Sequence, residues 1–420
     1  MFDKVVFHID VNSAFLSWEA VYRIKHLGGK LDLRDIPSVI GGDQEKRRGI
    51  ILAKSLSAKQ YGIQTGQSII EAKQKCPELL IVPPNYNLYE KSSRAFINIL
   101  KDFTPSVEQY SIDEAYMDMT GINLFGTPVE TANILKDRIH NELGFTVNIG
   151  VSSNKMLAKM ASDFRKPDLV HTLFPDEMKD KMWRLPVSEL FFVGRATTKK
   201  LFSLGIKTIG ELANTDIDIL KLHFKKHGEM IWDFANGHDF SLVESTPPPN
   251  KGYGNSTTIP FDVTDPSIAK MVLLALAETV ASRLRHANVK AEIVTVGIKD
   301  YEFHYASHQM VLISPTNITV EIHKYASRLF ERLWDGKPIR HLGIHTSRIK
   351  DQTANRQLNM FDYTDYDRLE KLDQAVDIIR DRYGIDAVKR AVFVKGPIDH
   401  LSGGISREKR TVDYTKEKID

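Results

Sequence analysis

The spacing of hydrophobic and polar positions changes several times along the 420-residue chain, and each spacing predicts a different kind of element. Apolar runs at 5–9 and within 107–120 predict two strands. Between them, residues 41–83 predict short strands and a helix over 67–75. After residue 186, Gly194, Gly205 and Gly210 divide the chain into short helices. The first half of the chain therefore mixes α and β elements.

The second half has a clearer pattern, which predicts strand, helix, strand, strand, helix and strand. These elements are expected at 256–262, 266–286, 291–300, 309–319, 320–334 and 339–349. This β-α-β-β-α-β order is that of a ferredoxin-like domain. Beyond residue 351 the chain becomes polar, with one further helix predicted over 365–383 and a charged end.

Proline-containing breaks separate these parts. They occur at Pro83-Pro84-Asn85, at Leu185-Pro186 and at Pro247-Pro248-Pro249. The last of these passes into Asn250-Lys251-Gly252, which has the composition of an interdomain linker. At about 100 to 200 residues per domain, the length also requires several domains. We therefore expect a multidomain α/β (α+β) protein.

Charge is nearly balanced over the whole chain, with 57 Lys and Arg against 54 Asp and Glu. This balance excludes a protein that coats nucleic acid through bulk positive charge. Residues 247–350 nevertheless hold 13 basic against 9 acidic side chains, a net +4. Such a local excess can bind a polyanion, although an ordinary solvated surface is an equally good explanation of the charge alone.

The single cysteine, Cys76, excludes an internal disulfide and a multi-thiolate metal site. The N-terminal residues lack the apolar core of a signal peptide, and no 18-residue uncharged apolar run follows. We therefore expect a soluble, cytoplasmic protein with no membrane partner.

Three carboxylates stand on the two apolar strands of the first half. Asp10 ends the first strand, and Asp113 and Glu114 are adjacent within the second. Adjacent residues of a regular strand point to opposite faces, so both can serve one site only if the strand bulges, turns or ends there. Taken singly, each is most simply an exposed carboxylate. Together they suit a pair of Mg²⁺ ions, because hard cations prefer oxygen ligands and two ions can act in phosphoryl transfer.

Five strings in order, HIDVNSAF, IPSVIGGD, GIILAKSLSAKQYGIQTG, YSIDEAYMDMTG and VNIGVSSNKMLAKMASDFRKPD, resemble the Y-family (translesion) DNA polymerases, the group that contains DNA polymerase IV and the catalytic subunit of polymerase V. The resemblance extends over residues 1 to about 350. It implies a right-hand fold with palm at 1–40 and 84–185, fingers at 41–83, a helical thumb at 186–246 and a ferredoxin-like little finger at 247–350, followed by a tail at 351–420. The implied activity is template-directed nucleotidyl transfer from dNTPs to a primer 3′-hydroxyl.

The resemblance also implies roles for individual residues. Asp10, Asp113 and Glu114 match the metal-binding carboxylates, and Val11 matches the residue whose carbonyl contacts one of two Mg²⁺ ions. Phe15 matches the steric gate that excludes a 2′-hydroxyl, although an aromatic core residue would fit the same position. The triphosphate contacts would be Lys166 in RKPD, Lys59 where many members have arginine, and Lys54.

Other positions depart from the common family pattern. Leu56 stands where polymerase IV commonly has tyrosine, and together with Lys54 this favours the polymerase V branch, so the subfamily stays open. In the thumb, FFVGRATTKKLFSLGI resembles a helix-hairpin-helix in which backbone amides near Gly194 face a DNA phosphate. Phe192 there occupies a position that is often glycine, which predicts a less open hairpin.

The tail carries a candidate docking peptide. Gln357, Leu358, Met360 and Phe361, with Asn359 between them, resemble the pentapeptide by which bacterial polymerases bind the sliding clamp. An alternative is a surface turn before the helix at 365. The expected partners are thus primer-template DNA, dNTPs and the clamp, with the chain as a monomer.

Two other functions remain open at this point. Palm-like sheets with paired carboxylates also occur in nucleotide cyclases, although the thumb-like module and the basic C-terminal domain favour a polymerase. Some relatives are thought to be clamp-binding scaffolds that have lost carboxylates, but this chain retains all three.

Overall fold

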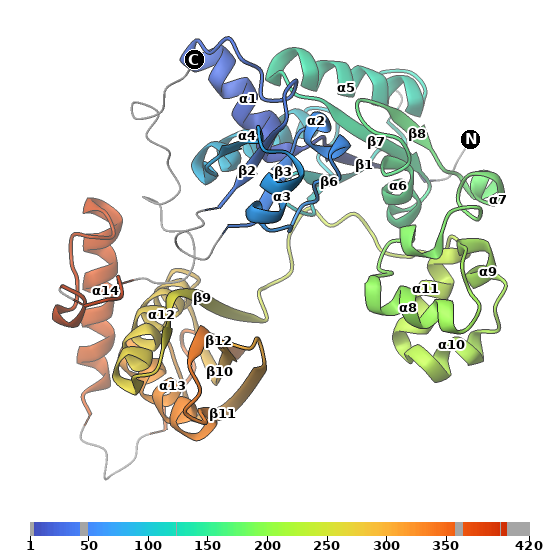
Figure 1. Ribbon diagram of the computed structural model, residues 1–420. Helices are drawn as coiled ribbons and strands as arrows, with labels where there is room; N and C mark the ends of the chain where they lie inside the picture. The colour runs from blue at the N-terminus through green and yellow to red at the C-terminus, as the bar shows by residue number, and fades with distance from the viewer. Residues whose placement is uncertain (1–3, 43–48, 123, 358–363, 395, 401–420) are drawn as a thin grey trace.

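The computed structural model describes residues 4–42, 49–122, 124–357, 364–394 and 396–400. In Figure 1 the main body lies above two smaller bodies, one made of helices and one built on a four-stranded sheet. The main body contains a five-stranded sheet in the order β5-β6-β1-β7-β8. These strands are β5 (Val107–Gln109), β6 (Glu114–Asp118), β1 (Val6–Val11), β7 (Val147–Ser152) and β8 (Val170–Thr172).

Both faces of this sheet are covered by helices, and strand alternation decides which residues meet them. Phe7 and Ile9 join the large core beneath α1 (Ala14–Leu27), α4 (Tyr86–Lys101) and α5 (Pro128–Leu143). Val6 packs on the opposite side with Ala158 of α6 (Lys155–Ser162). A Cβ added to Gly150 of β7 would lie 1.9 Å from the Ala158 carbonyl oxygen. This close approach fixes α6 against the middle of the sheet.

A small three-stranded body is attached beside this sheet. It comprises β2 (Ser38–Gly41), β3 (Ile51–Lys54), β4 (Leu80–Val82), α2 (Leu56–Gln60) and α3 (Ile69–Lys75). Its strands pair in the order β3-β2-β4, and residues such as Val39, Ile51 and Ile69 form a core of its own. The helix predicted over 67–75 is confirmed as α3.

The helical body follows η1 (Pro175–Glu177) and α7 (Met178–Lys181). It contains η2 (Val187–Glu189), α8 (Arg195–Ser203), α9 (Ile209–Ala213), α10 (Ile217–Phe224) and α11 (Lys226–Ala235). Its core is continuous with the main body, because Met156 and Met160 of α6 pack in the same apolar cluster as Leu201 and Ile231. The proline at 186 therefore marks a bend of the chain and not a boundary of packing.

The four-stranded body confirms the predicted β-α-β-β-α-β order. Its elements are β9 (Gly252–Val263), α12 (Pro266–His286), β10 (Val289–Asp300), β11 (Tyr305–Thr316), α13 (Thr319–Leu333) and β12 (Ile339–Asp351). The antiparallel sheet has the order β11-β10-β12-β9, with α12 and α13 packed in one core against it. The mixed α/β, multidomain architecture is thereby confirmed.

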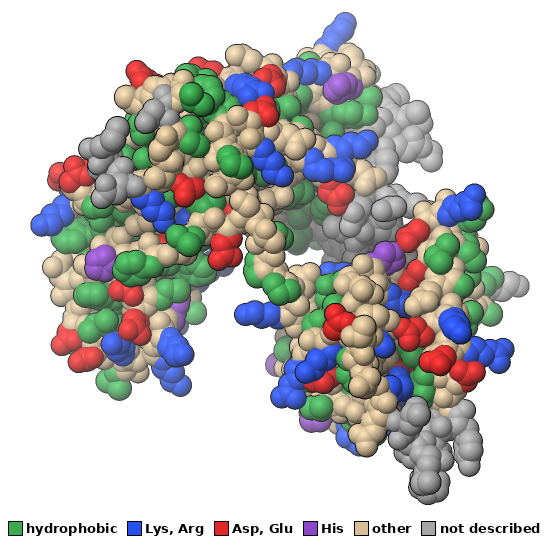
Figure 2. Space-filling model, turned by 180° about the vertical axis from the view of Figure 1, so that it is seen from behind, with side chains coloured by type: hydrophobic (Ala, Val, Ile, Leu, Met, Phe, Trp, Pro, Cys, Tyr) green, Lys and Arg blue, Asp and Glu red, His purple; other side chains and the backbone are tan. Residues whose placement is uncertain are grey.

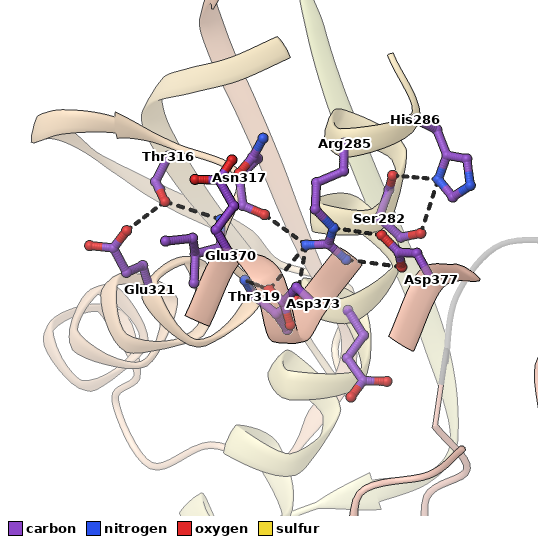
Figure 3. Close-up of polar contacts among 12 residues, drawn as sticks. Ser282, Arg285, His286, Thr316, Asn317, Thr319, Glu321, Glu370, Asp373 and Asp377 are labelled. Atoms are coloured by element: carbon purple, nitrogen blue, oxygen red, sulfur yellow. Dashed lines mark hydrogen bonds and ion pairs between the residues drawn. The ribbon is translucent and has the colours of Figure 1, made fainter. Parts of the chain in front are cut away.

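The C-terminal helix α14 (Tyr366–Tyr383) is docked on α12 of the four-stranded body (Figure 3). The guanidinium of Arg285 donates to Asp377 at 2.6 and 3.0 Å and to Asp373 at 3.1 Å. The Thr319 amide donates to the same Asp373 at 2.7 Å. Arg285, Asp373 and Asp377 are all at most 9% exposed, so α14 is held by buried ion pairs. A short helix, η3 (Ala391–Phe393), follows.

The connection between the helical and four-stranded bodies runs along the main body. The Lys155 ammonium contacts both the Glu108 carboxylate, at 2.7 Å, and the Leu242 carbonyl, at 3.2 Å. The Glu244 amide also donates to Glu108 at 2.8 Å. Among the described helices, none combines the length and apolar character needed to span a bilayer.

Candidate active site

The antiparallel pairing of β1 with β6 brings the three carboxylates together. Asp10 and Glu114 are directly opposite in the register, which places their side chains on one face of the sheet. Strand β6 begins at Glu114, so Asp113 precedes the regular strand and is not bound by its alternation. The Val11 amide donates to the Asp113 carbonyl at 3.0 Å and ties the two segments together. The condition set by the sequence, that the strand bulges, turns or ends at this pair, is met because β6 begins at Glu114.

Ser111 orients the acidic pair, a role that the sequence did not reveal. Its hydroxyl donates to the Asp113 carboxylate at 2.6 Å and accepts from the amides of Asp113 and Glu114 at 3.2 and 3.1 Å. A serine hydroxyl that accepts from the backbone amide two residues on stabilises a turn, and here the same hydroxyl orients the Asp113 carboxylate.

Two lysines on or after α6 lie against the carboxylates. The Lys159 ammonium is 2.8 Å from Glu114, 3.1 Å from Asp163 and 3.6 Å from Asp10. The Lys166 ammonium is 2.6 Å from Asp10 and 2.9 Å from Asp163. Lys166 was predicted as a site residue, whereas Lys159 was missed because it occupies an ordinary polar position of a helix.

Burial and charge act in opposite directions on these groups. Burial alone would lower the pKa of Lys159, but the carboxylates of Asp163, Asp10 and Glu114 raise it, so the ammonium stays charged. The pKa of Lys166 is raised in the same way, by Asp10 and Asp163 against burial. Desolvation raises the pKa of Glu114 despite the neighbouring ammonium of Lys159. The carboxylates thus form a concentrated negative site that attracts cations.

Asp10, Glu114 and Lys166 line a cleft of about 790 Å³ between the main and three-stranded bodies. The cleft contains every residue predicted for metal and nucleotide binding: Asp10, Val11, Phe15, Lys54, Lys59, Asp113, Glu114 and Lys166. They come from β1, α1, β3, α2, the start of β6 and the loop after α6. The fold therefore gathers residues from six separate segments into one site.

Lys54 and Lys59 form the basic wall of this cleft. Among the described residues, neither has a hydrogen bond or ion pair with an acidic group. Burial and the positive charge of Lys59 both lower the pKa of Lys54. Two lysines that repel each other in a cleft are stabilised by an anion, which favours a phosphate-binding role.

The Phe15 ring lies half-buried on the floor of the cleft. It stacks on Tyr89 of α4 with the ring centroids 4.4 Å apart and the planes 8° from parallel. Tyr86 and Trp18 pack around it at 6.1 and 5.9 Å. The two interpretations made from the sequence are compatible, because one face of the ring packs in the core and the side chain also lines the cleft.

The remaining predicted residues lie elsewhere. Gly194 caps the N-terminus of α8 and lines a separate hollow with Arg195 and Lys199. Gln357 lies on the four-stranded body, where its amide donates to Ser314 at 3.0 Å. Leu358, Met360 and Phe361 are outside the described residues. Figure 2 shows the helical body and the four-stranded body as separate masses with an open gap between them.

Two further groups of acidic and histidine side chains were found within the described residues: Asp300 with Glu302 and His304, and Asp386 with Asp399 and His400. Each is already balanced by a lysine. Lys337 lies 3.6 Å from Glu302, and Lys389 contacts both Asp386 and Asp399. Both groups lie outside the cleft that contains Asp10, Asp113 and Glu114.

Comparison with known proteins connects this geometry to a family. Residues 9–163 match the impB/mucB/samB family, residues 250–360 match the C-terminal domain of that family, and residues 189–239 match the thumb domain of DNA polymerase-iota. DNA polymerase IV of Clostridium acetobutylicum is 47% identical over 392 residues, covering 93% of this chain and 98% of that protein.

Two other relatives match the same share of this chain at lower identity. DNA polymerase IV of Acetivibrio thermocellus is 38% identical over 93% of this chain and 98% of its own length. DNA polymerase IV 2 of Bacillus subtilis is 38% identical over 93% of this chain and 95% of its own length. Among solved structures, a Y-family DNA polymerase chimera matches with a TM-score of 0.70 at 23% identity, covering 84% of this chain and 100% of that chain. At that identity the match concerns the fold alone.

Proposed function

This chain belongs to the impB/mucB/samB family, the Y-family DNA polymerases, and from that membership we propose how its residues carry out DNA synthesis. The chain is a translesion DNA polymerase that extends a primer with dNTPs on a DNA template. The cyclase alternative is set aside, because relatives that match 93% of the chain are DNA polymerases IV. Leu56 and Lys54 favoured the polymerase V branch, but these relatives are named DNA polymerase IV and do not support that hypothesis.

The carboxylates of Asp10, Asp113 and Glu114, with the Val11 carbonyl, would hold a pair of Mg²⁺ ions. When bound, such ions neutralise the attacking 3′-oxygen and the leaving pyrophosphate. The observation that supports this assignment is the pair of ammonium groups already against these oxygens, since the site is built to hold positive charge. All the donors are oxygens, as hard divalent cations require.

The basic wall of the cleft would receive the triphosphate of the incoming nucleotide. Lys54 and Lys59 have no acidic partner among the described residues, and Lys166 reaches the cleft beside Asp10. Lysine at position 59 offers charge without the two-pronged hydrogen bonding of arginine, so we assign it a looser contact. Phe15 would lie below C2′ of the sugar and leave no room for a 2′-hydroxyl.

In this proposal the main body is the palm (1–40 and 84–185), the three-stranded body the fingers (41–83), the helical body the thumb (186–246) and the four-stranded body the little finger (247–350). DNA would contact the uncovered face of the little-finger sheet, where Gly254, Gly297, Gly343 and His345 line a shallow hollow of about 440 Å³. Glycines there allow close approach of a backbone. The net +4 charge of this body would make binding fall steeply with added salt.

The pentapeptide at 357–361 would dock the enzyme on a sliding clamp. A glutamine amide and three apolar side chains can give useful affinity without a large interface. Tethering would raise the effective concentration of the polymerase at the primer end. The enzyme would act on DNA as a monomer.

Primer extension with Mg²⁺ tests the catalytic assignment. Asp113→Asn and Glu114→Gln should each reduce nucleotide addition by at least about 100-fold, as removal of a group that stabilises developing charge does, while leaving primer-template affinity nearly unchanged. Asp118→Asn is a matched control, because Asp118 lies on the same strand but accepts from the Thr120 amide. Near-normal extension by either site variant would contradict the assignment. It would leave a clamp-binding scaffold as the remaining function.

A further inference from the structure

The loop that carries Lys166 has few packing contacts of its own. This loop, residues 163–168, lies between α6 and β8 and contains no helix or strand. Four of its six residues are exposed, and Phe164 is the one that joins an apolar cluster. The Lys166 ammonium nevertheless lies 2.6 Å from Asp10. The loop backbone therefore depends on hydrogen bonds for a fixed position.

Asn148 of β7 provides hydrogen bonds to this backbone from inside the sheet. Its side chain is fully buried. Nδ2 donates to the Ser162 carbonyl at 3.2 Å and to the Arg165 carbonyl at 2.7 Å, and Oδ1 accepts from the Leu169 amide at 3.4 Å. These three points lie on both sides of Lys166 in the sequence. One amide side chain therefore fixes both ends of the loop.

The register of the sheet places Asn148 beside a catalytic carboxylate. In the antiparallel pairing of β1 with β7, Asn148 is directly opposite Asp10, so the two side chains lie on the same face. Asn148 bonds the backbone of the loop, while Asp10 contacts the ammonium that the loop carries. Two neighbouring strands thus determine where Lys166 enters the cleft.

A second buried group holds the start of the loop. The Ser162 hydroxyl donates to the Lys159 carbonyl at 2.8 Å, so it accepts from the Nδ1–H of His8 at 2.8 Å. His8 is fully buried and lies on the same face of β1 as Asp10. Burying a polar side chain costs free energy unless it is hydrogen-bonded. An apolar residue would pack under α6 at lower cost, so the loop, and not the core, explains an asparagine at position 148.

The other polar contacts of the loop are at the surface. The Lys136 ammonium lies 3.3 Å from the Asp168 carboxylate, which is 37% exposed. The His171 ring lies 3.0 Å from the Arg165 carbonyl in an exposed contact. Exposed ion pairs contribute little to stability. Asn148 is therefore the principal anchor of the loop.

We propose that Asn148 is a positioning residue of the polymerase, which holds the loop backbone so that the Lys166 ammonium is directed toward the triphosphate of the incoming nucleotide. The inference rests on the proposed function, in which Lys166 contacts that triphosphate. Asn148 does not line the cleft, so its effect on the nucleotide passes through the loop.

A double-mutant cycle with Lys166 tests this coupling. Asn148→Ala should raise the KM for dNTP about 3- to 10-fold, as loss of ordinary hydrogen bonds does, and leave primer-template affinity unchanged. Lys166→Ala should also raise this KM. In the Lys166→Ala background, Asn148→Ala should change the KM by less than about 2-fold, because the ammonium that it positions is gone. A packing role would give the same loss in both backgrounds.

Ser152→Ala is the matched control. Ser152 lies on the same strand and the same face as Asn148, is fully buried, and donates to the Leu173 carbonyl outside the loop. It should leave the KM for dNTP unchanged in both backgrounds, although it also removes a buried hydrogen bond. Thermal unfolding of each variant separates a loss of folded enzyme, which lowers the apparent kcat, from a weaker contact with the nucleotide, which raises the KM.

Two results would overturn the proposal. An unchanged KM in Asn148→Ala would mean that the loop keeps its place without the amide. Equal losses in the two backgrounds would mean that Asn148 does not act through Lys166. Failure of the proposed function looks different, because Lys166→Ala would then leave the KM for dNTP unchanged and would remove this inference together with the triphosphate contact.

Discussion

Replacing Lys159 with methionine should make the metal-free polymerase less stable and more dependent on divalent cations. Lys159 is 8% exposed and is the one ammonium that contacts Glu114 among the described residues. Asp10 and Glu114 are opposite each other across two strands, an arrangement that destabilises a sheet unless a cation intervenes. Without a metal, Lys159 supplies that cation.

The size of the effect follows from the distances. At an effective dielectric constant of about 20, unit charges 2.8 Å apart attract by roughly 6 kcal/mol. Desolvation of the buried ammonium offsets much of this, and removing one partner of a buried pair costs about 3 to 5 kcal/mol. Lys166 remains beside Asp10, and Glu114 keeps 20% exposure, so we expect the lower end of this range, about 3 kcal/mol. At about 2 to 4 °C per kcal/mol, the melting temperature should fall by roughly 6 to 12 °C.

The assay is thermal unfolding in EDTA and again with Ca²⁺ as a non-catalytic probe. A cation at 100 times its Kd stabilises the folded state by about 2.7 kcal/mol, and this gain should be larger in Lys159→Met because no ammonium competes for the carboxylates. Lys155→Met is the matched control on the same helix, since its partner is Glu108 outside the cleft. Equal melting temperatures of Lys159→Met and wild type in EDTA, or an equal gain with Ca²⁺, would refute the reasoning.

Other predictions concern the substrate and the clamp. Phe15→Ala should lower the ratio of dNTP to rNTP incorporation efficiency by opening space below C2′, and an unchanged ratio would leave Phe15 as a core residue only. Because burial and Lys59 lower the pKa of Lys54, its charge is lost as pH rises through a lower value than usual. The KM for dNTP should therefore rise at alkaline pH, and Lys54→Arg should delay that rise; identical pH profiles would argue against a phosphate contact. Alanine at Gln357, Leu358 and Phe361 should abolish stimulation by the clamp and leave clamp-free extension intact, and surviving stimulation would place the docking site elsewhere.

The strands and the little-finger topology could be predicted from sequence because they depend on local periodicity. The β-α-β-β-α-β order follows from six separate hydrophobic patterns, each within about 20 residues, and the structure matches them closely. The prediction that Asp10 lies close to Asp113 and Glu114 came from the resemblance to a known family and from the preference of hard cations for oxygen ligands. Periodicity alone gave only the condition that the strand bulges, turns or ends at the acidic pair.

The positions of Lys159 and Ser111 could not be predicted in this way. Lys159 is a polar residue in the helix KMLAKMAS, and its ammonium reaches Glu114 only because α6 lies across β1 and β7. That packing depends on the absence of a side chain at Gly150, which no pattern of polarity reveals. Long-range packing, and not local preference, determines which ordinary side chain becomes part of the site.

The C-terminal helix inverts the usual relation between polarity and burial. Its buried stripe contains Asp373 and Asp377, while Leu372 is 55% exposed. The hydrophobic pattern of the helix alone would predict the opposite orientation, with Leu372 buried and the two aspartates exposed. Its orientation is determined by Arg285, which is buried on α12 and would lack a charge partner without these two aspartates (Figure 3).

The attachment of α14 to the four-stranded body affects where the pentapeptide at 357–361 is anchored. Gln357, the last described residue before the gap, is bonded to Ser314, and Arg356 pairs with Glu321 on α13. After the gap, α14 returns to the same body through Arg285. Both flanks of the motif therefore belong to the little finger, and a clamp bound there would be held by that body and not by a free end.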